Sequence, residues 1–315
     1  MVYGIVALVL LFSSIKGYSG KRTSCLVQTT ADAIRFNLLR MLICILIGAA
    51  LVFLEGAQRF LAIEAGMLWI CVLAGGANAA FLIGWLLAVQ KNAMVSVDVG
   101  LTLGSLLPAV LCAILFTEPI SVPKMLGFAL ILVATAILAG HSKQTVNGGL
   151  GGALLLVFAA VGEGMSSFAQ QLYKQFYTDG GSAATGTVYP KTVYHFYTYV
   201  FAALALLLAL AVYLLLQRRH TKSAADGKRT AGRIPPRALV HILVMAICLF
   251  AANYFQTVAT NDYGMSSQML YPLLKGGCLI TVNITAMLFF GEKITKRSVL
   301  GSLVALAGII VMSIL

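Results

Sequence analysis

The stretch MSSQMLYPLLKGGCLITVNITAMLFFGEKITKRSVLGSLVALAGIIVMSIL, residues 265–315, decides the fold of this chain. It consists of two apolar runs separated by a short charged turn at residues 291–297. Each run is long enough for a bilayer-crossing α-helix, which needs about 20 apolar residues. The second run carries small residues that allow another helix to approach closely: Gly301, Ser302, Ala305 and Gly308. The stretch therefore predicts two membrane-spanning helices.

The whole chain continues this pattern. Of its 315 residues, 60% are hydrophobic and 10% are charged, and the mean hydropathy is +0.94. A soluble globular protein carries about 25% charged residues, so a soluble fold is excluded. The sequence predicts an all-α, multi-pass protein of the cell membrane. Its ten transmembrane helices are expected at residues 2–20, 33–54, 66–89, 95–116, 122–140, 150–176, 194–216, 238–260, 266–290 and 296–315.

A weak internal repeat organises these helices. Residues 116–118 (Phe-Thr-Glu) line up with residues 290–292 (Phe-Gly-Glu), and Leu126-Gly127 then lines up with Leu300-Gly301 without a gap. The alignment predicts two five-helix repeats, residues 1–145 and 146–315. Because five is odd, the second repeat enters the membrane from the opposite face. Inverted repeats of this kind are typical of secondary transporters, whose substrate site lies near the membrane midplane between the halves.

The loop charges predict an orientation. Of the 22 Lys and Arg residues, Arg40 and Lys275 lie inside expected helices. Of the remaining twenty, sixteen lie on the face that holds the loop after the first helix, and four lie on the other face: Arg59, Lys124, Lys174 and Lys191. Cytoplasmic loops carry an excess of Lys and Arg, so the first face is expected to be cytoplasmic and both termini outside.

Four ionisable residues inside expected helices are the main candidates for a substrate site: Lys275, Arg40, Asp98 and Glu163. Charges within the membrane are rare and usually mark a substrate or ion pathway. On this interpretation Lys275 and Arg40 hold an anionic or zwitterionic group. Asp98 or Glu163 then binds a proton or competes for the cation. The alternative is structural, with Lys275 paired to Asp98 and Arg40 paired to Glu163.

Several weaker candidates accompany these charges. Asn78 and Tyr271 are added to the predicted substrate site, although polar residues in membrane helices often serve only as hydrogen bonds between helices. Pro108 and Pro272 are expected to kink their helices, either as hinges or as simple packing features. Lys16, near the end of the first helix, either lines a vestibule or extends its charge to the membrane interface.

These residues resemble a known family. Ten helices in two copies, with the closing pattern Phe290-Gly291-Glu292-Lys293-Ile294 followed by Leu300-Gly301 and Gly308, are similar to the EamA-like transporters of the drug/metabolite transporter superfamily. The first copy departs from this pattern, with residues 117–119 (Thr-Glu-Pro) in place of Gly-Glu-Lys. Lys275 and Arg40 also resemble positions at which nucleotide-sugar transporters place cations. The resemblance implies cytoplasmic termini, contrary to the charge count.

Other chemistries find little support in the sequence. It lacks a Walker-type phosphate loop, and its six cysteines lack the CxxC or Cys/His spacing of metal sites. The four histidines fall at loops or helix ends, which disfavours a proton relay through imidazole. The basic residues do not form an amphipathic face for nucleic acid. We therefore expect no enzymatic activity, no cofactor, no metal and no nucleic-acid partner.

The leading hypothesis is a secondary transporter that moves a small polar, anionic or zwitterionic metabolite by alternating access, with proton coupling or exchange. The main alternative is a proton-coupled exporter of lipophilic cations that uses Glu163 or Asp98. A membrane enzyme would need a carboxylate or histidine cluster at one interface. A channel would favour a ring of like residues from an oligomer. The sequence leaves the substrate, the direction, the coupling ion and the oligomeric state open, with a homodimer among the alternatives.

Overall fold

The structure is a computed structural model that describes residues 2–27, 29–91, 97, 101–102, 104–116, 121–142, 149–179, 186–221, 236–290 and 296–313. Within these residues it contains α-helices, one 3-10 helix and no strand, which confirms the all-α prediction. The helices are α1 (Val2–Ser24), α2 (Thr30–Leu54), α3 (Ala65–Lys91), α5 (Leu106–Phe116), α6 (Val122–Ser142), α7 (Gly149–Tyr177), α8 (Lys191–Thr221), α9 (Pro236–Asn261), α10 (Ser267–Phe290) and α11 (Lys296–Ser313), with η1 at Ala57–Leu61.

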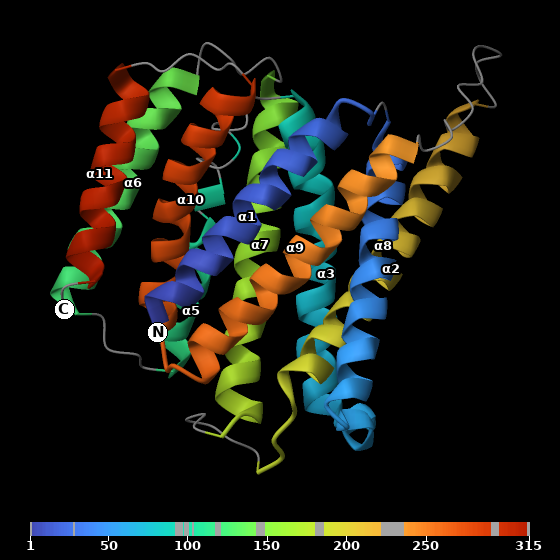
Figure 1. Ribbon diagram of the computed structural model, residues 1–315. Helices are drawn as coiled ribbons and strands as arrows, with labels where there is room; N and C mark the ends of the chain where they lie inside the picture. Colours follow the sequence, from blue (N-terminus) through green and yellow to red (C-terminus); the bar gives the residue numbers. More distant parts are fainter. Residues whose placement is uncertain are drawn as a thin grey trace.

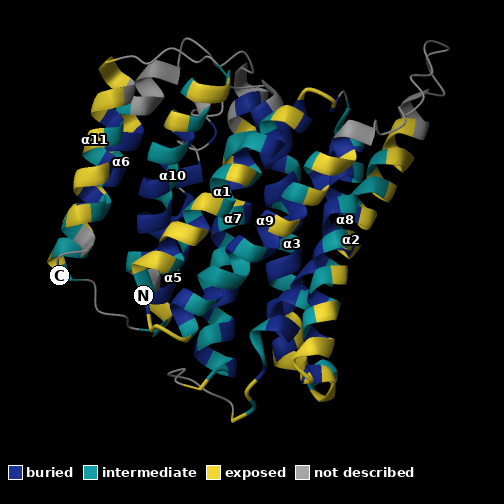
Figure 2. Cartoon of the chain, viewed as in Figure 1, coloured by how far each residue is buried: buried dark blue, intermediate teal, exposed yellow. Residues whose placement is uncertain are grey.

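Six of the described helices are long and apolar enough to cross a membrane: segments of α1, α2, α3, α8, α9 and α10. Shorter apolar segments lie at Leu107–Phe116, Val122–Ile137 and Val299–Val311. Large apolar side chains such as Leu46, Trp69 and Ile114 are exposed on the outside of the bundle. Exposed residues follow the outward faces of α11 and α2 (Figure 2). An apolar exterior of this size fits lipid rather than water, so the chain is a multi-pass membrane protein.

Local sequence explains where α2 begins. The hydroxyl of Thr29 accepts a hydrogen bond from the backbone N–H of Asp32 at 3.1 Å, and the Asp32 carboxylate accepts one from the backbone N–H of Thr29 at 3.1 Å. This capping box satisfies two N–H groups that the first turn of a helix leaves without partners. The apolar run of α2 then follows.

The expected helix at residues 95–116 is wrong in its described part, because it is interrupted. Ser105 lies in a turn, and both its backbone N–H and its hydroxyl donate to the carbonyl of Thr102, at 3.2 and 2.7 Å. Helix α5 starts one residue later, so Pro108 lies in its first turn. The first four N–H groups of a helix have no partner within the helix, so Pro108 breaks no hydrogen bond there. Pro272, by contrast, lies inside α10.

Four pairs of helices lie side by side: α3 with α7, α1 with α9, α2 with α8, and α6 with α11. Figure 1 shows α1 running alongside α9, with α6 and α11 at one edge of the bundle. Small residues permit the last contact, since a Cβ atom added to Gly308 would lie 2.8 Å from the carbonyl oxygen of Gly127. The close approach expected along residues 301–308 is therefore present at Gly308, and α6 is the partner.

Candidate functional site

Two adjoining cavities lie inside the bundle. The first has a volume of about 90 Å³ and is lined by residues of α1, α3, α7, α9 and α10. The second, of about 60 Å³, shares six lining residues with the first: Lys16, Phe81, Glu163, Ser167, Asn253 and Gln256. We call the two together the central chamber. A water molecule needs about 10–15 Å³, so the chamber has room for several waters or a small ligand.

An ion pair from two helices lies at the wall of this chamber. The Lys275 Nζ atom of α10 is 2.5 Å from the Glu163 Oε1 atom of α7, and the two side chains are 17% and 22% exposed. The second carboxylate oxygen of Glu163, Oε2, is buried and has no hydrogen-bond partner within the described part of the chain. The sequence predicted both residues as site residues. The pairing differs from the structural alternative, in which Arg40 was the partner of Glu163 and Asp98 the partner of Lys275.

Two glycines place Glu163 at the chamber. A Cβ atom added to Gly162 would lie 2.6 Å from the backbone nitrogen of Phe81 in α3. One added to Gly164 would lie 2.5 Å from the backbone oxygen of Gly104. Both neighbours are backbone atoms, so α7 can pack this closely only because these two positions lack side chains. The tight packing on both sides fixes the depth of the carboxylate between them.

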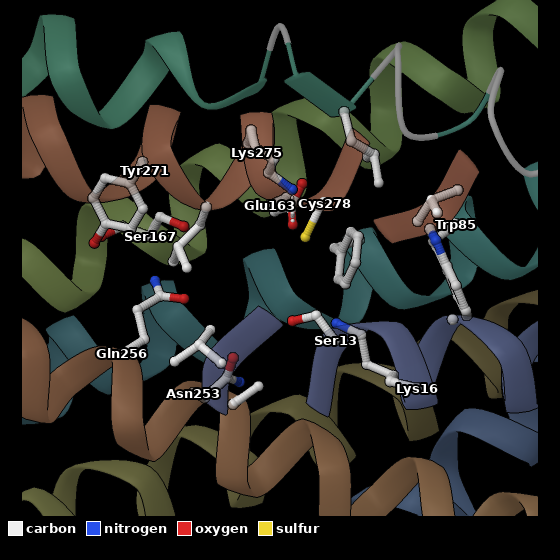
Figure 3. Close-up of a pocket in the computed structure, with 17 residues that line it drawn as sticks. Ser13, Lys16, Trp85, Glu163, Ser167, Asn253, Gln256, Tyr271, Lys275 and Cys278 are labelled. Atoms are coloured by element: carbon white, nitrogen blue, oxygen red, sulfur yellow. Dashed lines mark hydrogen bonds and ion pairs between the residues drawn. The ribbon is translucent and has the colours of Figure 1, made fainter. Parts of the chain in front are cut away.

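Lys16 brings a second ammonium group into the chamber. It lies on α1 and lines both cavities, and its Nζ atom lies 5.8 Å from the centre of the Phe81 ring. Figure 3 shows Ser13 and Lys16 entering from α1, opposite Lys275 and Glu163. Of the two alternatives for Lys16, the structure favours a residue that lines a cavity over one that extends to the interface. The sequence signal was the uninterrupted apolar run before it.

Uncharged polar side chains complete the lining. Ser13 of α1, Ser167 of α7, and Asn253 and Gln256 of α9 all border the first cavity. Tyr271 of α10, a predicted site residue, also lines it and donates a hydrogen bond to the backbone carbonyl of Ser167 at 2.8 Å. Polar groups that converge in a pocket fix the orientation of a ligand. The chamber can therefore hold a charged, hydrogen-bonding molecule.

The remaining predicted site residues fall in different places. Asn78 of α3 lines the second cavity, and its amide nitrogen is buried without a hydrogen-bond partner. Arg40 of α2 is 1% exposed, lines neither cavity, and none of its side-chain nitrogens has a hydrogen-bond partner. Asp98 lies outside the described residues. The structure thus brings Lys275, Glu163, Tyr271 and Asn78 to one chamber and leaves Arg40 apart from it.

A wall of polar and aromatic side chains closes one end of the second cavity. Gln170 of α7 donates a short hydrogen bond to the Thr257 hydroxyl of α9, and the His195 Nε2 atom of α8 lies 2.9 Å from the same hydroxyl. Beside them, the ring of Tyr194 stacks on that of Tyr173 at 4.4 Å between centroids. Tyr194 lines the second cavity, and Tyr173 lines a larger cavity of about 810 Å³ on the far side.

That larger cavity opens among the connections after α2, α7 and α9. Its lining includes Glu55, Lys174, Asp179, Lys191 and Asp262, and the last two form an ion pair at 2.6 Å. We call this cavity the vestibule. His195 was assigned from sequence to a helix end and set aside. It does lie in the first turns of α8, but its side chain is 3% exposed and lines the second cavity of the central chamber.

The described part of the chain contains neither a metal-binding cluster nor a disulfide. Within it, no group of three or more His, Cys, Asp or Glu side chains could hold a metal ion. None of the six cysteines, all of them described, forms a disulfide, and Cys278 of α10 lines the first cavity one turn beyond Lys275.

Comparisons with known proteins bear on the fold alone. No model of a protein family matches the sequence, and no curated protein matches it. Among 28 matching chains of solved structures, one is described only as "Crystal structure of protein". Its fold is similar to this one with a TM-score of 0.70 at 14% sequence identity, over 99% of this chain and 96% of that chain.

Proposed function

We propose that this protein is a secondary transporter of a small polar, anionic or zwitterionic metabolite, working by alternating access. The observation that carries the proposal is the Lys275–Glu163 ion pair at the wall of a polar central chamber, with Lys16 facing it from α1. Charges at this depth are costly unless they face a partner or a water-filled cavity. Here they have both, and the chamber lies among helices from both halves of the chain.

The helix contacts support two inverted repeats, residues 1–145 and 146–315. Exchanging the halves replaces α1, α2, α3, α5 and α6 by α7, α8, α9, α10 and α11, respectively. The contacting pair α3–α7 then becomes α9–α1, the pair α3–α8 becomes α9–α2, and α5–α7 becomes α10–α1, and each of these is also a contact. The pairs α2–α8 and α6–α11 map onto themselves. This pattern is the one expected of ten spans related by a twofold axis in the membrane plane.

The same arrangement supports the resemblance to EamA-like members of the drug/metabolite transporter superfamily. We propose that the protein acts in the cell membrane, and that its orientation follows the charge count, with the cation-rich face in the cytoplasm, rather than the resemblance, which implies the opposite orientation. The vestibule then opens outside, because its connections follow α2, α7 and α9 on the opposite face. The wall of Gln170, Thr257 and His195 separates vestibule from chamber and would have to open for a substrate to pass.

Competition between the ligand and the Glu163 carboxylate for Lys275 supplies a mechanism of transport. Glu163 and an anionic substrate compete for Lys275, because one ammonium cannot fully satisfy both. Substrate binding would draw Lys275 from Glu163, and the freed carboxylate could take up a proton. When the substrate leaves, the ion pair forms again and neutralises both charges. The chain's own residues perform this cycle, and the proposal includes no enzymatic step and no cofactor.

One observation favours the second candidate, an exporter of lipophilic cations. The Glu163 Oε2 atom is buried without a hydrogen-bond partner and could accept a cationic ligand. Two ammonium groups share the chamber with this single carboxylate, however, and they repel such a ligand. The anionic substrate is therefore preferred. Competition between a lipophilic cation and protons for Glu163 would reverse that preference.

Uptake into proteoliposomes tests the proposal. Purified protein is assayed for counterflow of a panel of small organic anions and zwitterions, with lipophilic cations as a third arm. We expect uptake of at least one anion or zwitterion, reduced more than tenfold in Lys275→Ala. The matched control is Lys296→Ala, which removes an exposed lysine from α11 and should leave uptake unchanged. Equal uptake by wild type and Lys275→Ala contradicts the proposed site.

A further inference from the structure

The charges of the central chamber do not balance. We propose that Lys16 is the first cation to receive the anionic group of the substrate, before the Lys275–Glu163 pair opens, and that the chamber selects small organic monoanions. This inference rests on the transport function proposed above, and it narrows the substrate class of the same chamber.

The two lysines of the chamber have different surroundings. Lys275 already has a carboxylate at 2.5 Å. Among the described residues Lys16 forms no ion pair; the face of the Phe81 ring lies 5.8 Å from its Nζ atom, and Glu163, Lys275 and Arg40 are its charged neighbours beyond ion-pair distance. A cation–π contact is weaker than an ion pair with a buried carboxylate, so it does not replace a counter-ion. Lys16 is therefore the cation that is available to a ligand without first breaking an ion pair.

The net charge of the lining sets the charge of the ligand. Lys16 and Lys275 oppose Glu163 alone, which leaves one positive charge in the described lining. Among the described residues, the lining holds no other Lys, Arg, Asp or Glu side chain. Uncompensated charge in a low-dielectric interior is costly. A monoanion leaves the loaded chamber neutral, whereas a zwitterion leaves one positive charge and a dianion one negative charge.

The uncharged lining indicates the rest of the ligand. Ser13 and Ser167 offer hydroxyl groups, and Asn253 and Gln256 offer amides. Phe81 and Trp85 form an apolar wall on the α3 side, beside Lys16. The ligand that fits is a small organic monoanion with hydroxyl or amide groups and a short apolar part.

The charge of the chamber can be measured without a known substrate. Ser13 lines the first cavity one turn before Lys16, so Ser13→Cys is introduced as the only cysteine, with the six native cysteines replaced. Its reaction rate is measured with an anionic reagent, 2-sulfonatoethyl methanethiosulfonate, and with the cationic 2-trimethylammonioethyl analogue. The anionic-to-cationic rate ratio is divided by the same ratio for 2-mercaptoethanol in solution. This normalised ratio reports the electrostatic potential at the thiol.

We expect a normalised ratio of about ten, because one net positive charge lies near the thiol in a medium of intermediate dielectric constant. Lys16→Gln should return the ratio to about one. Glu163→Gln should raise it further, by a similar factor, because it leaves two uncompensated lysines. This second variant changes the charge in the opposite direction, so a general loss of structure cannot explain both results.

Two results would overturn the inference. A ratio that stays unchanged in Lys16→Gln means that Lys16 does not set the charge of the chamber. A ratio that falls in Lys16→Gln but stays well above one means that the chamber holds more than one net positive charge, and its ligand is then a dianion. The transport assay is separate: normal reagent ratios without anion uptake would refute the transporter and leave the role of Lys16 in anion binding intact.

Discussion

Lys275 and Arg40 are both cations inside membrane-spanning helices, but their surroundings are opposite. Lys275 has Glu163 at 2.5 Å and borders a polar chamber. Arg40 is 1% exposed in the core between α2, α8 and α9, and its three nitrogens have no hydrogen-bond partner among the residues that the structure describes. Tyr199 and Cys44 are its polar neighbours, and the Cys44 thiol already donates to the carbonyl of Ala246 at 3.5 Å. Depth in the membrane therefore does not by itself identify a site residue.

The comparison separates two roles that the sequence could not distinguish. A paired cation beside a cavity can exchange its partner for a ligand. An unpaired cation in a packed core carries a desolvation cost that nothing in its surroundings offsets. The predictions below test this contrast, beginning with the change that should have the largest effect.

Glu163→Ala should lower the stability of the protein by about 3 kcal/mol, because removing one partner leaves the other charge buried and uncompensated. The measurement is the unfolding midpoint in detergent. The double variant Glu163→Ala/Lys275→Ala should recover most of the loss, since both charges are then absent. If the double variant is less stable than Glu163→Ala alone, the pair is not the coupled unit described here.

Arg40→Met should stabilise the protein by about 2.5 kcal/mol, the low end of the cost of an Arg at the centre of a membrane helix. Met preserves most of the apolar contacts of the arginine stem. We expect transport to persist in this variant, because Arg40 lines neither cavity. Loss of transport with normal stability would instead support the original prediction that Arg40 binds substrate, in another conformation.

Gly162→Ala should destabilise the protein by about 1–3 kcal/mol, the usual cost of overpacking, because the added methyl group meets backbone atoms of α3. It should also reduce transport, because a shift of α7 would displace the Glu163 carboxylate from its place at the chamber. Gly76→Ala is the matched control in a neighbouring helix, where a Cβ atom would meet nothing within 4 Å. Equal effects of the two substitutions would show that close packing does not position Glu163.

Thr257→Val should have the smallest effect on stability, about 0.6 kcal/mol, the average for a hydrogen bond between membrane helices. It removes the hydroxyl that joins Gln170 of α7 to His195 of α8. If these contacts hold the wall between chamber and vestibule closed, the variant should increase the accessibility of chamber residues from the vestibule side. Unchanged accessibility would assign the hydroxyl to helix packing only.

Much of the architecture could be predicted from the sequence. Apolar runs of about 20 residues and the charged turns between them locate the helices to within a few residues, because a bilayer fixes both length and polarity. The break at Ser105 was missed, since residues 95–116 carry Asp98 as their only charge and read as one apolar run. The turn depends on a local hydrogen bond to the Thr102 carbonyl, which hydropathy does not register.

The sequence could predict several residues of the candidate site, but not which of them contact one another. Lys275 and Glu163 stood out because charges are rare in such helices. Their pairing depends on how α7 and α10 face each other, which a single sequence does not specify. The sequence left Lys16 open between a cavity and the membrane interface, and it disfavoured His195, because both were expected near helix ends, where charge and polarity are ordinary. Only the tertiary packing turns both toward the chamber.

The most direct test compares two native thiols that match the two cations. Cys278 lies one turn from Lys275 and lines the chamber, whereas Cys44 lies one turn from Arg40 and is 0% exposed. Variants that retain only one of these cysteines are treated with a membrane-impermeant maleimide from each face of oriented vesicles. Alternating access predicts modification of Cys278 from both faces and of Cys44 from neither. An unreactive Cys278 on both sides would contradict a water-accessible chamber and remove the basis for a transporter.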